Sequence, residues 1–209
     1  MKLPIKDVQV FGLVTRLVKQ KGLDILLMAL AIILGTIPAV IAGLFLESYM
    51  ETVFRSSLIV AGTLALGSLI FIAAEWVALR VPKGPLTVWK GIGIGVMQTL
   101  ALIPGMSRSG MSISAGLFLG LTRDEAARFS FLLAFPILLG SGLKKLADLA
   151  SGGVLSDIGL SLLAGAVTAF FVGIVVIHYL LKYLKNHTLI AFAWYRAVLA
   201  VAVLALVAF

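Results

Sequence analysis

The sequence has 209 residues, of which 61% are hydrophobic and 12% charged, and its mean hydropathy is +1.15. One soluble core cannot bury that much apolar surface, so the surplus must contact lipid. The net charge is +8, and the charged residues lie between the apolar segments. This placement is typical of residues that set membrane topology and contact anionic lipid head groups, and it argues against nucleic-acid binding. Without cysteine there is no disulfide, thiolate nucleophile or Cys-bound metal. We therefore predict an all-α polytopic membrane helix bundle, one integral membrane domain over residues 1–209.

Apolar segments of about 20 residues, the length that crosses roughly 30 Å of hydrocarbon, recur along the sequence. We predict spanning helices over residues 23–46, 57–79, 129–143, 158–181 and 188–209. Gly35 and Pro38 predict a kink in the first of these helices. If the segment 88–121 turns back within the membrane, most Lys and Arg residues of the loops lie on the same side of the membrane as the amino terminus. The positive-inside rule therefore favours a hairpin that enters from the cytoplasm.

The segment 88–121 differs from the others because a polar turn interrupts it. Apolar runs at 88–103 and 111–121 flank the sequence P-G-M-S-R-S-G at 104–110, and neither run is long enough to span alone. Such a pattern is typical of a re-entrant hairpin or broken helix, which is tolerated only beside protein or a watery cavity. We call residues 104–110 the re-entrant turn and predict two short helices that meet there inside the bundle.

The re-entrant turn places Arg108 between Ser107 and Ser109, directly before a predicted helix. A charge at membrane depth needs a partner, either an anion or an internal carboxylate. The guanidinium fork, the two hydroxyls and the helix N-terminus together suit a phosphate group. The alternative is a structural helix break, in which the arginine pairs with a carboxylate and the serines cap the helix. Gln98, near the turn, fits a phosphate donor and a bond between helices equally well.

Other polar residues carry weaker expectations. Glu75 and Arg196 are expected to pair with each other, although Arg196 equally fits an anchor at the membrane interface. The Gly-x-Gly-x-Gly run at 91–95 predicts close helix packing and not a nucleotide loop, because no strand precedes it. Ser112 and Ser114 are expected to be packing residues.

Several motifs resemble the undecaprenyl-diphosphate phosphatase (bacitracin-resistance) family. They are Q-T-L-A-L-I-P-G-M-S-R-S-G at 98–110, F-S-F-L-L-A-F-P at 129–136, G-T-I-P-A at 35–39, A-A-E at 73–75 and Y-R at 195–196. The resemblance covers nearly the whole chain and corresponds to the last three quarters of the family fold. It implies a multi-pass enzyme of the bacterial inner membrane that hydrolyses the C55 isoprenyl diphosphate to its monophosphate, recycling the lipid carrier of cell-wall synthesis. It also implies that Arg108 and Ser107 are catalytic residues and that Ser109, Gln98, Gly105 and Gly110 bind the substrate.

The family begins with another re-entrant element, an E-x-x-x-E helix followed by a P-x-S-S-T-G-H turn, and nothing before Leu23 resembles it. In the family, that element supplies the glutamates, serine and histidine associated with metal binding and catalysis. The divalent cation that the resemblance implies, Mg²⁺ or Ca²⁺, is therefore expected to find its ligands there. We expect the sequence to be a fragment, a gene model with a late start or a degenerate paralogue, and phosphate release by the chain alone to be near background.

The implied partners are a polyprenyl diphosphate lipid and the bilayer, and no nucleic acid is expected. The sequence leaves open whether the chain forms a homo-oligomer. The competing hypothesis is a lipid or small-molecule transporter or flippase with an anion site at the midplane, because broken helices in inverted repeats are also a transporter architecture. An in-frame upstream sequence encoding the acidic element would favour the enzyme.

Overall fold

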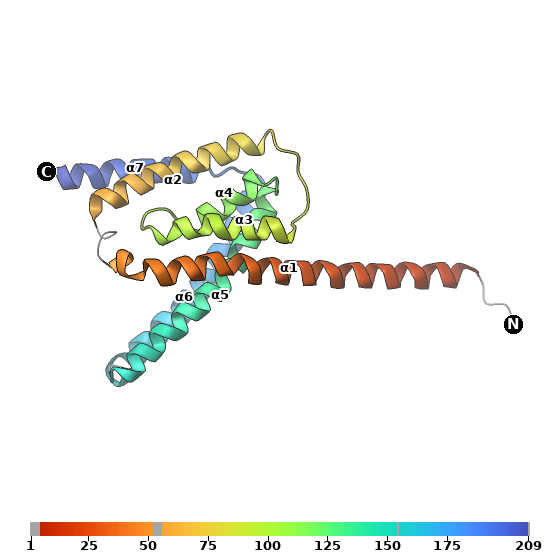
Figure 1. Cartoon of the computed structure of the whole chain (residues 1–209), viewed down its shortest axis with the longest axis horizontal. Coiled ribbons are helices and arrows are strands. Elements are labelled where there is room, and N and C mark those ends of the chain that lie inside the picture. Colours follow the sequence, from red (N-terminus) through yellow and green to blue (C-terminus); the bar gives the residue numbers. More distant parts are fainter. Residues whose placement is uncertain (1–4, 52–55, 154, 209) are drawn as a thin grey trace.

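A computed structural model describes the backbone of residues 5–51, 56–153 and 155–208, and every regular element in these ranges is a helix (Figure 1). The elements are α1 (Ile5–Glu51), α2 (Ser57–Ala78), α3 (Val88–Thr99), the 3-10 turn η2 (Leu100–Leu102), α4 (Arg108–Phe118), α5 (Arg123–Ser151), α6 (Leu155–Leu184) and α7 (Ile190–Ala208). Side chains are described for residues 22–46, 49, 56–153 and 158–207.

Five of the described helices contain segments that are long and apolar enough to cross a membrane. These segments are Gly22–Leu46, Ser57–Ala78, Arg123–Ser151, Ile158–Leu184 and Ile190–Val207. Each of them overlaps one of the five spans that the hydropathy pattern predicts, and residue 209 of the last predicted span lies outside the described residues. Large apolar side chains are exposed along them, for example Leu160 on α6 and Leu206 on α7, as lipid contact requires. The prediction of an all-α, multi-pass membrane helix bundle is confirmed.

Helix α5 is longer than its apolar core predicts, at 29 residues. It begins with a capping box, in which the Thr122 hydroxyl accepts the N–H of Glu125 and the Glu125 carboxylate accepts the N–H of Thr122. Such a box satisfies two backbone donors that a helix start leaves free. The helix therefore starts in the charged segment ahead of the apolar run, which hydropathy alone does not mark. Helix α1 continues through Pro38, and the kink there stays a prediction.

The short helix α4 lies at the centre of the bundle. Helices α1 and α3 run side by side, α2 runs beside α7, and α4 packs against α2, α3 and α5 (Figure 1). Eight consecutive residues of α4, Gly110 to Leu117, are buried. Helices α5 and α6 lie together and lean away from the others (Figure 1). This arrangement buries the re-entrant turn's helix and leaves the spanning helices to face lipid.

Close packing of α1 against α3 depends on small residues. A Cβ atom added at Gly95 would lie 1.9 Å from the carbonyl oxygen of Gly35, and one at Gly91 would lie 2.7 Å from the Cβ of Ala31. Both distances are shorter than real Cβ contacts allow, and the obstacles belong to or adjoin the backbone. The prediction that this glycine run packs helices together is confirmed.

Candidate functional site

The segment 88–121 forms the predicted pair of short helices. Helix α3 ends at Thr99, the 3-10 turn follows, and α4 begins at Arg108. Each helix is far shorter than the roughly 20 residues a span needs. The chain therefore breaks and turns inside the bundle, and the prediction of two short helices is confirmed.

The backbone of the re-entrant turn adopts two rare conformations. Gly105 has φ +94°, which glycine adopts freely. Ser107 has φ +69° and is the only non-glycine residue with positive φ in the described ranges. Such a conformation costs about 1–3 kcal/mol and persists only where the surroundings enforce it. The Ser107 hydroxyl caps α4 by accepting the N–H of Gly110 at 3.3 Å, so the serine is held at the helix N-terminus.

Arg108 and Gln98 line one cavity of about 250 Å³ together with apolar side chains. The other lining residues are Ala39, Ala101, Leu102 and Ile137. Gln98 is 2% exposed, and its Oε1 accepts the hydroxyl of Ser112 at 3.0 Å. Its Nε2 has no hydrogen-bond partner among the described residues. The bond between helices that was one expectation for Gln98 is thus present, while its amide keeps a free donor. Ser112 is more than a packing residue, because it holds this amide.

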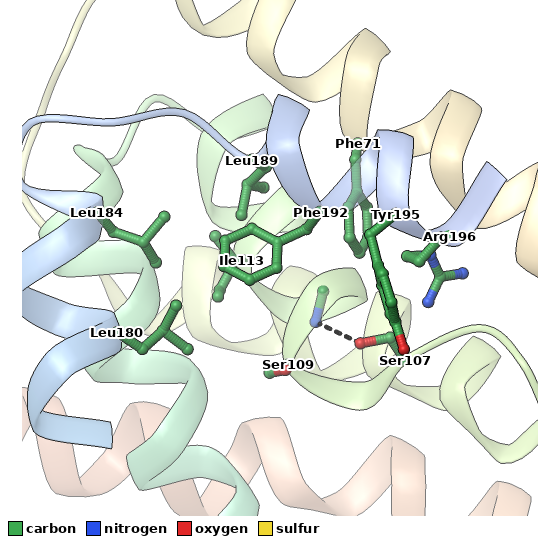
Figure 2. Close-up of a pocket in the computed structure, with 11 residues that line it drawn as sticks. Phe71, Ser107, Ser109, Ile113, Leu180, Leu184, Leu189, Phe192, Tyr195 and Arg196 are labelled. Atoms are coloured by element: carbon green, nitrogen blue, oxygen red, sulfur yellow. Dashed lines mark hydrogen bonds between the residues drawn. The ribbon is translucent and has the colours of Figure 1, made fainter. Parts of the chain in front are cut away.

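Ser107, Ser109 and Gly110 line a second cavity, of about 210 Å³, between α2, α4, α6 and α7 (Figure 2). Its walls are mostly apolar, and Tyr195 and Arg196 join the serines at one end (Figure 2). The structure therefore divides the predicted site between two cavities. Ser109 lies about 100° around α4 from Arg108, and Ser107 precedes the helix with a positive φ, so neither serine shares the direction of the Arg108 side chain. Arg108 consequently faces a different cavity from its two serine neighbours.

The guanidinium of Arg108 has no ion pair and no hydrogen bond to any described residue, and its side chain is only partly exposed. The structural alternative for this residue required an internal carboxylate partner. The two ion pairs in the described part of the chain are Arg123–Glu75 and Arg128–Asp124, so that partner is not among the described residues. The N–H donors of Arg108, at the first position of the central helix α4, are therefore not used by any described residue.

The predicted pair of Glu75 and Arg196 is wrong. Arg123 donates from Nε and Nη2 to the Glu75 carboxylate, which also accepts the backbone N–H of Leu189 at 2.8 Å. Arg123 begins α5, and that helix start lies beside the carboxyl end of α2. Arg196 is 7% exposed and donates to backbone carbonyls of α2 and of the re-entrant turn. It is therefore not an anchor at the membrane interface either.

Sequence reasoning missed Thr63, whose hydroxyl donates to the Pro104 carbonyl of the re-entrant turn. A threonine within the apolar run of α2 was the available signal, because a polar side chain there needs a partner. Sequence reasoning also left Arg123 within a charged loop. Its position one residue after the capping Thr122 was the signal that it starts a helix.

The described residues do not fit a divalent cation. They contain no group of three or more His, Asp or Glu side chains close enough to hold a metal ion. Glu75, the buried carboxylate of the bundle, is already occupied by Arg123 and the Leu189 N–H. This part of the chain offers hydrogen-bond donors that suit an anion, and it does not offer a set of metal ligands.

Comparison with known proteins agrees with the motifs. Residues 6–202 match the family described as bacitracin resistance protein BacA. The undecaprenyl-diphosphatase of Mycolicibacterium smegmatis is 44% identical over 178 residues, which cover 84% of this chain and 64% of that protein. The undecaprenyl-diphosphatases of Moorella thermoacetica and Corynebacterium glutamicum are 40% and 47% identical, over 83% and 79% of this chain and 66% and 57% of their own lengths. The chain thus spans less than two thirds of the length of these relatives, and it belongs to the BacA family.

Proposed function

We propose that this protein takes part in the hydrolysis of undecaprenyl diphosphate in the bacterial inner membrane, and that its described residues bind the diphosphate head group. The relatives named above are undecaprenyl-diphosphatases, and their names describe a phosphatase and not a transporter. The observation that carries the proposal is Arg108, an arginine inside the bundle without a partner among the described residues. A half-buried cation inside a membrane bundle calls for an anion.

The N-terminus of α4 is suited to bind that anion. The first N–H groups of a helix lack intrahelical acceptors, and the helix dipole places partial positive charge there. Arg108 is the first residue of α4 and adds a planar fork that matches two phosphate oxygens. Gln98, whose Nε2 has no hydrogen-bond partner among the described residues, lines the same cavity. These donors together support binding of one phosphate group of the substrate.

The chemistry of the reaction explains why an arginine is useful at this position. Water attacks the terminal phosphorus, the bond to the bridging oxygen breaks, and undecaprenyl monophosphate leaves as phosphate forms. Negative charge spreads over the equatorial oxygens and the leaving oxygen as the bond breaks. Donors that are fixed in advance stabilise that charge without reorganising. Magnesium or calcium would act in the same reaction only with ligands from outside the described residues.

Phosphate release with undecaprenyl diphosphate and magnesium tests the proposal. We expect release near background from the purified chain, because its described residues supply anion donors but no cluster of metal ligands. The same chain carrying the family's whole acidic element, the E-x-x-x-E helix with its P-x-S-S-T-G-H turn, at its amino end is expected to release phosphate well above background.

Two results would contradict this account. Release by the chain alone at the rate of a full-length relative would mean that Glu75 or another residue performs the part assigned to the acidic element. A chain with the acidic element that binds undecaprenyl diphosphate but never releases phosphate would argue for lipid binding or transport instead of hydrolysis.

A further inference from the structure

We propose that Arg196 is a positioning residue, which fixes the re-entrant turn so that Arg108 and the N-terminus of α4 are presented to the diphosphate. This inference rests on the proposed function. The Nη2 of Arg196 on α7 donates to the Gly105 carbonyl at 2.7 Å and lies 3.4 Å from the Leu64 carbonyl of α2. One nitrogen thus ties α2, α7 and the re-entrant turn together, three residues before α4 begins.

The re-entrant turn needs an external hold. Gly105 and Ser107 both have positive φ, and such conformations persist only where neighbours enforce them. After Arg108, Ser130 of α5 donates to the Ser109 carbonyl at 3.5 Å. Before Arg108, the turn is held by Arg196 and by Thr63, which donates to the Pro104 carbonyl. Both contacts fix carbonyl groups on the amino side of Arg108. Releasing them would let the turn relax and would move the first residue of α4.

Helix α2 is shaped to admit the Arg196 side chain. A Cβ atom added at Gly67 would lie 2.0 Å from Nη2 of Arg196, so a larger residue there would displace the guanidinium from its present position. The Phe71 ring lies 4.9 Å from the guanidinium carbon, and a Cβ atom at Gly110 would lie 2.0 Å from that ring. Phe71 therefore fills the space between Arg196 and the first turn of α4 (Figure 2).

The contacts of Arg196 differ from those of Arg108 in a way that experiment can use. Arg196 belongs to neither ion pair of the described residues, and each hydrogen bond that it makes to those residues uses Nη2. A single donor nitrogen suffices for that role, and an ammonium can supply one. We therefore expect Arg196→Lys to retain most of the function and Arg196→Met to lose it. Arg108, in contrast, needs the two parallel N–H donors of its guanidinium to bind a phosphate group.

The test measures two quantities on the full chain in lipid nanodiscs. One is hydrogen–deuterium exchange of the backbone amides in the re-entrant turn, and the other is the affinity for undecaprenyl diphosphate. The variants are Arg196→Met, Arg196→Lys and Gly67→Ala. Gly62→Ala is the matched control, because a Cβ atom at Gly62 would meet no atom of the described residues within 4 Å. Gly67→Ala keeps the arginine and its charge while displacing Nη2.

We expect Arg196→Met and Gly67→Ala to speed exchange in the turn at least tenfold and to weaken binding about tenfold, while exchange in α5 is unchanged. Arg196→Lys and Gly62→Ala should stay within about threefold of the parent in both measurements. Unchanged exchange in the turn of Arg196→Met and Gly67→Ala would overturn the inference, whether or not binding falls. Lost binding with unchanged exchange would make Arg196 a direct ligand. If the parent chain does not bind the diphosphate, the proposed function fails. Slower amide exchange in the turn of the parent than in the turn of Gly67→Ala would still support the inference that Arg196 fixes the turn.

Discussion

Replacing Arg108 with lysine is expected to weaken binding of undecaprenyl diphosphate by about tenfold to a hundredfold, and to remove most phosphate release from the chain that carries the acidic element. Lysine keeps the charge but cannot make two parallel hydrogen bonds to one phosphate group. A hydrogen bond to a charged group contributes about 1.5–3 kcal/mol, which corresponds to this range of affinities. Ser109 lines a different cavity from Arg108, so Ser109→Ala should cost less, at most the roughly 1–2 kcal/mol of one hydrogen bond.

Arg128→Lys is the matched control for this substitution. Arg128 lies on the exposed side of α5, paired with Asp124 four residues earlier, so the same change there should leave affinity and turnover unaltered. The assignment of the phosphate clamp would be refuted if Arg108→Lys kept near-normal affinity while Arg196→Lys abolished it. The re-entrant turn would then be a capped helix break, with the diphosphate bound in the cavity beside Arg196.

Glu75→Gln is expected to destabilise the fold by about 3 kcal/mol, because it breaks an ion pair whose carboxylate is buried and leaves the Arg123 charge, 31% exposed, without its counterion. Glu75 is 4% exposed and also accepts the N–H of Leu189 ahead of α7. It thereby joins the end of α2 to the starts of α5 and α7. The free energy of unfolding, measured by titrating the purified protein in mild detergent with SDS, tests this expectation.

Asp124→Asn is the matched control for Glu75→Gln, at an exposed ion pair. It also removes the carboxylate partner of an arginine, but the side chains of Arg128 and Asp124 are 53% and 32% exposed. Exposed pairs contribute about 0–1 kcal/mol, and the position of Asp124 in the first turn of α5 adds a similar small amount. Equal losses of stability in Glu75→Gln and Asp124→Asn would contradict the structural role given to Glu75.

The sequence predicted the spans and the broken helix because both depend on local properties. Span length follows from hydropathy, and two apolar runs too short to cross, separated by a Pro/Gly-rich polar turn, leave few arrangements in a membrane. The tight packing at Gly91 and Gly95 was also predictable, since small residues at regular spacing permit close helix contact. These features require no knowledge of which helices are neighbours.

The partners of the charged residues could not be predicted in the same way, because they depend on how the helices are arranged. Glu75 bonds to Arg123, 48 positions away in the sequence, instead of Arg196, and nothing local distinguishes the two arginines. The division of Ser107, Arg108 and Ser109 between two cavities likewise depends on which helices surround α4. Helix α5 exceeded its predicted length because capping and helix propensity continue a helix beyond the hydrocarbon, where hydropathy gives no signal.

The affinity of the chain for three lipids with the same tail tests the central claim most directly, that the re-entrant turn binds a diphosphate. The lipids are undecaprenyl diphosphate, undecaprenyl monophosphate and undecaprenol, measured with the full chain in nanodiscs that contain no other anionic lipid. The account predicts that the diphosphate binds at least about tenfold more tightly than the alcohol, with the monophosphate between them, and that Arg108→Lys removes most of this difference. Equal affinity for all three lipids would show that the chain recognises only the isoprenyl tail, and would contradict the account.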